Sequence, residues 1–309
     1  MSSEDINLPA EVEDKSKRNI ITADPDELDI EASRAPLMDH LVELRTRIMI
    51  MVAAFFVSVI GCYCFHTHIL SLLVHPLAVA SSLYEEAQHN AGHGGPFDLI
   101  MVLTGLKHIA SVKNIPLIAT APMEVFFTNL RLAMFGGVIV SFPVLAFQLY
   151  RFVAPGLYKR ERMAFLPFLI AAPVLFLMGM ALVYFMILPM VLWFSLNQQV
   201  VGSAGVAVQF MPKVSEYLQL IETLMIAFGL CFQLPVIITL LGMTGMVTSK
   251  MLGGLRKYAI LGIVVVAAVV TPPDPISQVM LSIPIWLLYE ISILCVKVIE
   301  LRRKPQQGA

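Results

Sequence analysis

Long apolar runs, separated by short charged segments, make up most of this chain. A helix that crosses about 30 Å of hydrocarbon needs roughly 17–25 consecutive, mainly apolar residues. The pattern predicts six such spans, at residues 48–65, 132–150, 163 to about 193, 223–247, 258–271 and 276–296. The last two are joined by the segment TPPDP, whose prolines cannot continue a helix and whose shortness forces an antiparallel hairpin. We therefore predict an all-α polytopic membrane protein with six transmembrane helices.

Composition and charge support this class and orient the spans. Hydrophobic residues make up 58% of the chain and charged residues only 14%, whereas about a quarter of a soluble domain is charged. Cytoplasmic loops retain Lys and Arg. Segments on the side of the two termini hold thirteen bases: Arg45, Arg47, Arg151, Lys159, Arg160, Arg162, Lys250, Arg256, Lys257, Lys297, Arg302, Arg303 and Lys304. The opposite segments hold four, Lys107, Lys113, Arg131 and Lys213, so we expect both termini in the cytoplasm.

The spans are flanked by two tails. Residues 1–35 carry ten acids against four bases and lack the apolar core of a secretory signal. We expect a disordered, acidic cytoplasmic tail there, a membrane domain at 36–303 and a short cytoplasmic tail at 304–309.

Prolines and one short span bear on the shape of the membrane domain. Six prolines lie inside the apolar segments: Pro143, Pro167, Pro173, Pro189, Pro235 and Pro284. Bent helices favour a concave, cupped assembly, although proline kinks are also ordinary in membrane helices. The uncharged residues 258–273 reach only about 24 Å as a helix. Either the bilayer thins beside this fifth span or neighbouring helices shield its ends. Residues 69–83 and 98–112 have helical spacing and are expected to cap the outer face.

The polar residues give little support for catalysis, a metal or a coupled ion. On a helix Cys62 faces with His66 and Cys64 with His68, so the four point in two directions and a zinc site is not expected. No histidine pair faces the membrane interior, as haem would need. Within the predicted spans the only charged side chain is Glu290, toward the cytoplasmic end, which argues against a proton-coupled transporter.

Two acids stand in base-rich, membrane-proximal segments. Glu43 precedes Arg45 and Arg47, and Glu161 lies between Arg160 and Arg162. Glu43 can pair with Arg47 one helical turn later, and Glu161 can stabilise the start of the third span through its dipole. Alternatively, both carboxylates serve a ligand.

One uncharged polar residue, Gln233, lies near the predicted bilayer centre, about 16 Å beyond Glu222 along the helix. An amide in hydrocarbon seeks a hydrogen-bond partner on another helix. Gln233 can therefore connect two helices of this chain or dock a polar side chain of a separate single-span partner.

Several motifs resemble one known family. HLVELRTRI, HPL, FFTNLRLAM, SFPVLAFQLYRFVAPGLYKRER, FGLCFQLPV and TPPDPISQ occur in this order between residues 36 and 303. Together they are similar to the TatC family, the receptor subunit of the twin-arginine protein translocase.

The resemblance implies a receptor without covalent chemistry or cofactor, for folded proteins that carry twin-arginine signal peptides. It implies a bacterial inner membrane, export driven by the proton-motive force, single-span partners of the TatA and TatB type and further copies of the chain itself. No nucleic-acid partner is expected. The rival classes are a small-solute secondary transporter, which should show two related halves and a midplane site, and a membrane enzyme with metal or haem.

The resemblance also assigns residues. Glu43 and Glu161 would contact the arginines of the signal, and Arg45 would help to position this surface. Phe152, Leu157 and Tyr158 would hold the backbone and apolar residues of the signal. Pro76, Pro143, Tyr184 and Asp274 match family positions that we interpret as structural. Gln233 stands where many members carry a glutamate linked to docking of single-span partners, so a mechanism that needs a titrating group there is in doubt for this chain.

Overall fold

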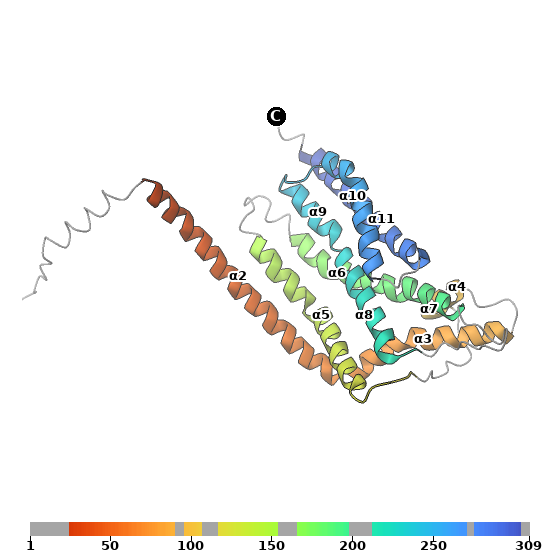
Figure 1. Ribbon diagram of the computed structural model, residues 1–309. Coiled ribbons are helices and arrows are strands. Elements are labelled where there is room, and N and C mark those ends of the chain that lie inside the picture. The colour runs from red at the N-terminus through yellow and green to blue at the C-terminus, as the bar shows by residue number, and fades with distance from the viewer. Residues whose placement is uncertain are drawn as a thin grey trace, which may run out of the picture. The chain divides into compact units, whose positions relative to one another are not determined.

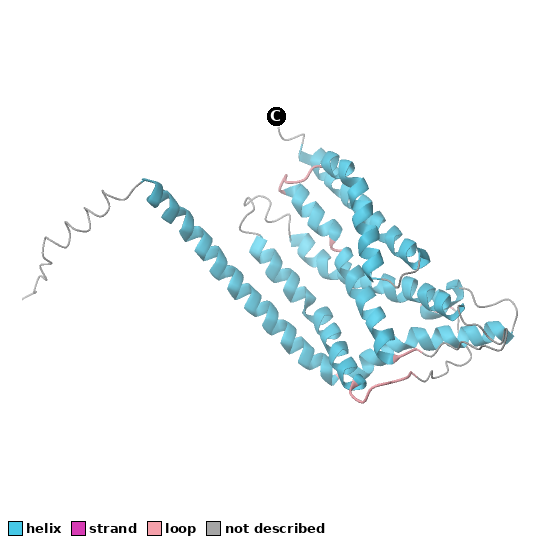
Figure 2. Cartoon of the chain, in the orientation of Figure 1, coloured by secondary structure: helices cyan, strands magenta, loops and turns pink. Residues whose placement is uncertain are grey.

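Helices make up nearly all of the described chain (Figures 1 and 2). The computed structural model describes residues 25–89, 96–106, 117–153, 166–197, 212–270 and 275–303. Within these ranges the only β-type contact is a single bridge between Ile118 and Lys213. The prediction of an all-α protein is confirmed. The chain divides into two compact units, Met1–Ile50 and Met51–Ala309.

The helices follow one another in the order in which the apolar runs occur. They are α2 (Pro25–Cys64), α3 (His66–His89), α4 (Pro96–Leu103), α5 (Glu124–Val153), α6 (Leu166–Leu182), a π-helical turn (Val183–Ile187), α7 (Leu188–Asn197), α8 (Val214–Cys231), α9 (Leu234–Met243), α10 (Ser249–Val270) and α11 (Pro275–Arg303).

Seven stretches of the described chain are long and apolar enough to cross a membrane. Six of them overlap the six predicted spans, with α6 and α7 forming one stretch and α8 and α9 another. The seventh, His66–Tyr84 in α3, is the segment predicted to cap the outer face. Figure 1 shows α3 running crosswise to α8, an orientation that suits a cap better than a further span.

Helices α5, α8 and α10 begin earlier than the spans predicted from the sequence. Helix α5 starts at Glu124 and α8 at Val214, so Arg131 and Glu222 lie inside helices rather than at the ends of spans. Helix α10 starts at Ser249 and has 22 residues, so it extends beyond the uncharged stretch from which a short fifth span was predicted. The predictions used charged residues as span limits, which fails where a charged side chain is paired or reaches the interface.

The N-terminal unit contains the start of α2, which begins at Pro25. A helix therefore forms ten residues before the end of the predicted acidic tail. Proline is well tolerated at the first position of a helix, because its missing N–H would have no partner there. Residues 1–24 and 304–309 lie outside the described residues.

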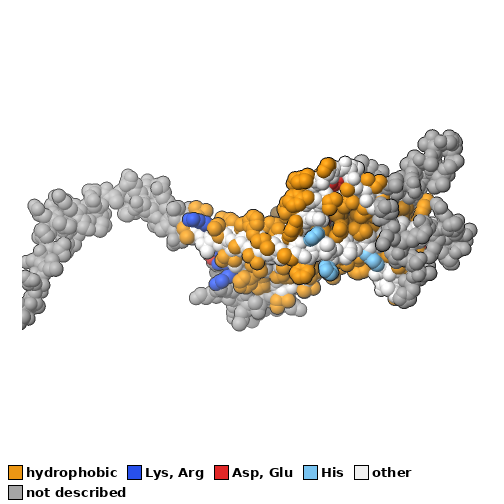
Figure 3. Space-filling view, turned by 90° about the horizontal axis from the view of Figure 1, so that it is seen from below, with side chains coloured by type: hydrophobic (Ala, Val, Ile, Leu, Met, Phe, Trp, Pro, Cys, Tyr) orange, Lys and Arg blue, Asp and Glu red, His pale blue; other side chains and the backbone are white. Residues whose placement is uncertain are grey.

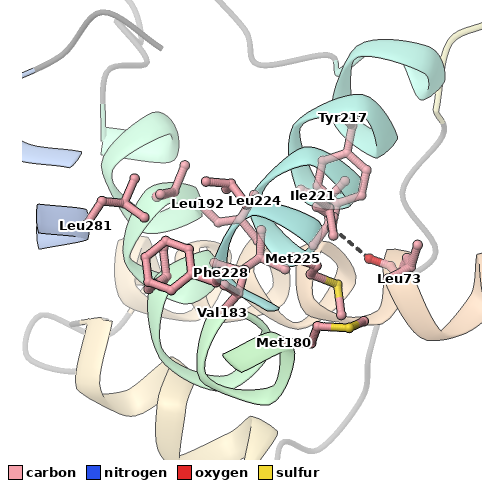
Figure 4. Packing of buried hydrophobic residues seen from close by; sticks show 14 of the residues in the cluster. Leu73, Met180, Val183, Leu192, Tyr217, Ile221, Leu224, Met225, Phe228 and Leu281 are labelled. Carbon is pink, nitrogen blue, oxygen red and sulfur yellow. Dashed lines mark hydrogen bonds between the residues drawn. The ribbon is translucent and has the colours of Figure 1, made fainter. Parts of the chain in front are cut away.

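The hydrophobic core of the larger unit lies where α3, α6, α7 and α8 meet. Figure 4 shows Leu73, Val183, Leu224 and Phe228 packed together at this place. The core is buried although the outside of the protein is also apolar, since hydrophobic side chains cover most of the described surface in the view of Figure 3. An apolar exterior around a packed interior is what a lipid-embedded helical protein requires.

Candidate functional site

Glu43 and Arg47 form an ion pair on α2. The Nε of Arg47 donates to Glu43 Oε1 at 3.0 Å, and its Nη2 binds the same oxygen. The Glu43 side chain is 34% exposed and that of Arg47 is 13% exposed. The two residues are one helical turn apart, so they share a face of α2. The predicted helix pair is confirmed, and the acid sits on a surface that already holds a guanidinium group.

Arg45 lies on a different side of the same helix. It follows Glu43 by two residues, which is a rotation of about 200° at 3.6 residues per turn, and it is exposed. The helix therefore does not bring Arg45 against the Glu43 carboxylate. A role of Arg45 in positioning the surface stays a prediction.

The other predicted signal-binding residues occur in the sequence at the end of α5 or after it. Phe152 is half-buried near the end of that helix. Leu157, Tyr158 and Glu161 lie outside the described residues, as does Asp274. Because Glu43 belongs to the N-terminal unit and Phe152 to the larger one, their grouping into one site stays a prediction from the resemblance.

Gln233 connects two helices of this chain. It is buried at the break between α8 and α9, and its Nε2 donates to the carbonyl oxygen of Ala172 on α6 at 2.8 Å. The break forms because Pro235 lacks a backbone N–H. The backbone N–H of Gln233 donates to the carbonyl of Leu230, three residues earlier, at 2.9 Å. The structure thus contains the hydrogen bond between two helices of this chain that was predicted as one of two roles for Gln233. Docking of a partner at this position stays a prediction.

Two residues interpreted as structural, Pro76 and Tyr184, meet in one hydrogen-bonding arrangement. Pro76 lies inside α3 and has no N–H for the carbonyl of Leu72 four residues earlier. The hydroxyl of Tyr184, from the π-helical turn, donates to that carbonyl at 3.0 Å. Tyr217 on α8 donates to the next carbonyl, that of Leu73, at 2.9 Å (Figure 4). The two tyrosines thus tie α3 to the spans. Pro143 lies inside α5.

We expect Tyr184→Phe to lower the free energy of unfolding by about 0.5–1.5 kcal/mol, because the Leu72 carbonyl loses its hydrogen-bond donor. Unfolding of the detergent-solubilised protein by heat or sodium dodecyl sulfate measures the loss. Tyr258→Phe is the matched control, since Tyr258 is 72% exposed, and it should leave stability unchanged. Equal effects of the two variants would contradict the role of Tyr184.

A polar cluster at the start of α5 and α8 was missed by the sequence analysis. Arg131 Nε lies 2.7 Å from Glu222 Oε2, with side-chain exposures of 39% and 3%. Seven residues earlier on each helix, Ser215 Oγ donates to Glu124 Oε1 at 2.6 Å, and Lys213 Nζ lies 3.8 Å from the same oxygen. The shared seven-residue spacing, two helical turns, is the sequence signal that could have revealed it.

This cluster differs from two predictions made from the sequence. Glu222 is a buried acid inside a candidate span, so Glu290 is not the only charged residue there. Arg131, counted among the bases of outer loops, lies inside α5. Glu290 itself is paired across the α10–α11 hairpin, where Arg256 Nη2 donates to its Oε2 at 2.9 Å.

Comparison with known proteins identifies the family. The family model described as "Sec-independent protein translocase protein (TatC)" matches residues 39–284. The TatC protein of Magnetococcus marinus is 40% identical over 282 residues, which cover 91% of either chain. That of Escherichia coli K12 is 32% identical over 262 residues, covering 84% of this chain and 86% of its own.

A solved structure is similar as well. The crystal structure of a twin-arginine translocase receptor, TatC, superposes with a TM-score of 0.65 at 30% identity and covers 84% of this chain and 98% of that one. Family, relatives and fold agree over most of the length. This chain therefore belongs to the TatC family of Sec-independent protein translocase proteins, and it is a polytopic helical membrane protein.

Proposed function

We propose that this chain is the receptor subunit of a twin-arginine translocase in a bacterial inner membrane, with both termini in the cytoplasm. It binds the signal peptides of folded cargo proteins through the carboxylates of Glu43 and Glu161. It assembles with single-span subunits of the TatA and TatB type and with further copies of itself, and export is driven by the proton-motive force.

The Glu43–Arg47 contact is the observation that carries the proposal. Glu43 already binds a guanidinium group through two N–H donors in a partly exposed position. An arginine of a signal peptide offers the same planar fork, whereas lysine offers a compact, strongly hydrated charge. A carboxylate that holds a guanidinium at such a surface can therefore prefer arginine over lysine.

Glu43→Gln and Glu161→Gln should each weaken binding of a twin-arginine signal peptide about tenfold, because each removes one charge-assisted contact. The affinity of a twin-lysine version should fall less. Fluorescence anisotropy with labelled peptides and the protein in nanodiscs measures both dissociation constants.

The control is Glu216→Gln, which neutralises an exposed acid at the start of α8. It should bind both peptides as the wild type does. Equal losses for the two peptides in the Glu43 or Glu161 variant would contradict an arginine-specific contact.

Docking of the single-span subunits is proposed at Gln233. The amide nitrogen is engaged with Ala172, so a partner would meet the amide oxygen or exchange with the intramolecular bond. Gln233→Leu should then reduce copurification of these subunits with the protein. Unchanged copurification, with a folded variant, would exclude Gln233 as the docking residue.

A further inference from the structure

The candidate binding carboxylate has a competitor built into its own helix. Arg47 donates from Nε at 3.0 Å and from Nη2 to the same oxygen, Glu43 Oε1. This is the chemistry that the proposed ligand would use. A guanidinium group of a signal peptide that binds this oxygen must displace Arg47 or share the oxygen with it.

The intrahelical pair has an advantage in this competition. Arg47 is fixed one turn from Glu43, so it loses no translational freedom when it pairs, and it is largely covered, with 13% of its side chain exposed. Pairs of this spacing are individually weak. Arg47 therefore pairs with Glu43 when no ligand is bound, but the pair is weak enough for a ligand to displace Arg47.

We infer that Arg47 is an intramolecular competitor that lowers the affinity of the empty receptor for its signal peptides. This inference rests on the proposed function and adds a residue that sets affinity at the same site. Apparent affinity scales with the fraction of receptor whose site is open. Every peptide that uses Glu43 competes with the same group, so Arg47 lowers affinity by one common factor and leaves discrimination to Glu43.

The opposite role gives the opposite result. If Arg47 served to orient Glu43 for the ligand, its removal would weaken binding. If Arg47 acted only through its charge, removal of any nearby positive charge would have the same effect. Competition alone predicts tighter binding that depends on the presence of the Glu43 carboxylate.

The test measures dissociation constants of twin-arginine and twin-lysine signal peptides for the full chain in nanodiscs. Arg47→Met should tighten binding of both peptides by the same factor, about 1.5- to twofold, which corresponds to the stabilisation that an intrahelical charged pair provides. Arg47→Lys, which keeps the charge but lacks the fork, should tighten it less. In the Glu43→Gln background Arg47→Met should change nothing, and Lys257→Met, which removes an exposed base on α10, should leave both dissociation constants unchanged.

The outcomes separate this inference from the proposed function. Weaker or unchanged binding in Arg47→Met, together with weaker binding in Glu43→Gln, would overturn the competitor role and leave the site intact. Unchanged binding in Glu43→Gln would overturn the site and the competitor role with it. Tighter binding in both Arg47→Met and Lys257→Met would overturn the competitor role in favour of a general charge effect.

Discussion

Arg131→Met is expected to lower the free energy of unfolding by about 3–5 kcal/mol. The substitution leaves Glu222 as an unpaired charge in a buried position, where desolvation is no longer offset by the guanidinium group 2.7 Å away. One oxygen of Glu222, Oε1, already lacks a hydrogen-bond partner among the described residues, so the carboxylate would have no compensating contact there. Sodium dodecyl sulfate unfolding of the purified protein, followed by circular dichroism, measures the change.

The double variant Arg131→Met/Glu222→Leu should recover most of this loss. Replacing a buried ion pair by apolar side chains of similar volume is often neutral, whereas removing one partner is costly. Arg256→Met is the matched control, because it breaks a more exposed pair. The Arg256 side chain is 51% exposed and that of Glu290 is 26% exposed. Such pairs contribute about 0–1 kcal/mol to stability. Comparable losses in Arg131→Met and Arg256→Met would show that burial of Glu222 does not set the cost.

The buried pair also bears on the secondary-transporter class. A lack of buried charge inside the predicted spans would disfavour such a transporter, but Glu222 is a buried acid inside a candidate span. Arg131 and Glu222 lie about 10 and 12 Å from the starts of α5 and α8, roughly halfway between the starts and the middles of the candidate spans Glu124–Phe152 and Val214–Met243. The pair neutralises its own charge and joins two helices, as a structural contact would. The family match, rather than the absence of charge, is what disfavours a small-solute transporter.

How far the sequence could predict the fold depended on the kind of residue at each boundary. Runs of apolar residues placed all six predicted spans, because length and hydropathy are properties of the segment alone. The starts of α5 and α8 could not be placed this way. Arg131 and Glu222 are charged, and they are tolerated inside membrane spans because they form an ion pair with each other. Such a pairing depends on two helices that are 91 residues apart in the chain (222 − 131).

In the candidate site, too, a contact within one helix was easier to predict than a contact between distant helices. The Glu43–Arg47 pair was predictable because the spacing of four within one helix fixes it. The hydrogen bond from Tyr184 to the Leu72 carbonyl was not predictable, although Pro76 and Tyr184 had both been singled out, because it joins α3 to the π-helical turn more than one hundred residues later. Gln233 was predicted to have a partner on another helix, and the structure supplies it as the Ala172 carbonyl.

Gly179→Ala is expected to destabilise the membrane domain by about 1–3 kcal/mol, because it overpacks the contact between α6 and α8. A Cβ at this position would lie 2.8 Å from the backbone carbonyl oxygen of Phe228 and 2.9 Å from ring carbons of Phe232. The approach is reciprocal, since a Cβ on Gly229 would lie 2.6 Å from the ring of Phe176. Neither helix can move away cheaply, as Phe176 is buried and stacks on Phe142 with ring centroids 3.8 Å apart. Close approach at small residues is how membrane helices gain packing energy.

The matched control for this variant is Gly262→Ala in α10, where a Cβ would meet no atom within 4 Å. Alanine is the better helix former, so this variant should be unchanged or up to about 1 kcal/mol more stable than the wild type. The same detergent unfolding measurement compares both variants. The two stability changes have opposite signs because the added methyl group meets a packed helix at Gly179 and open space at Gly262. A loss of similar size in both variants would mean that glycine acts through backbone flexibility, and not through the contact between α6 and α8.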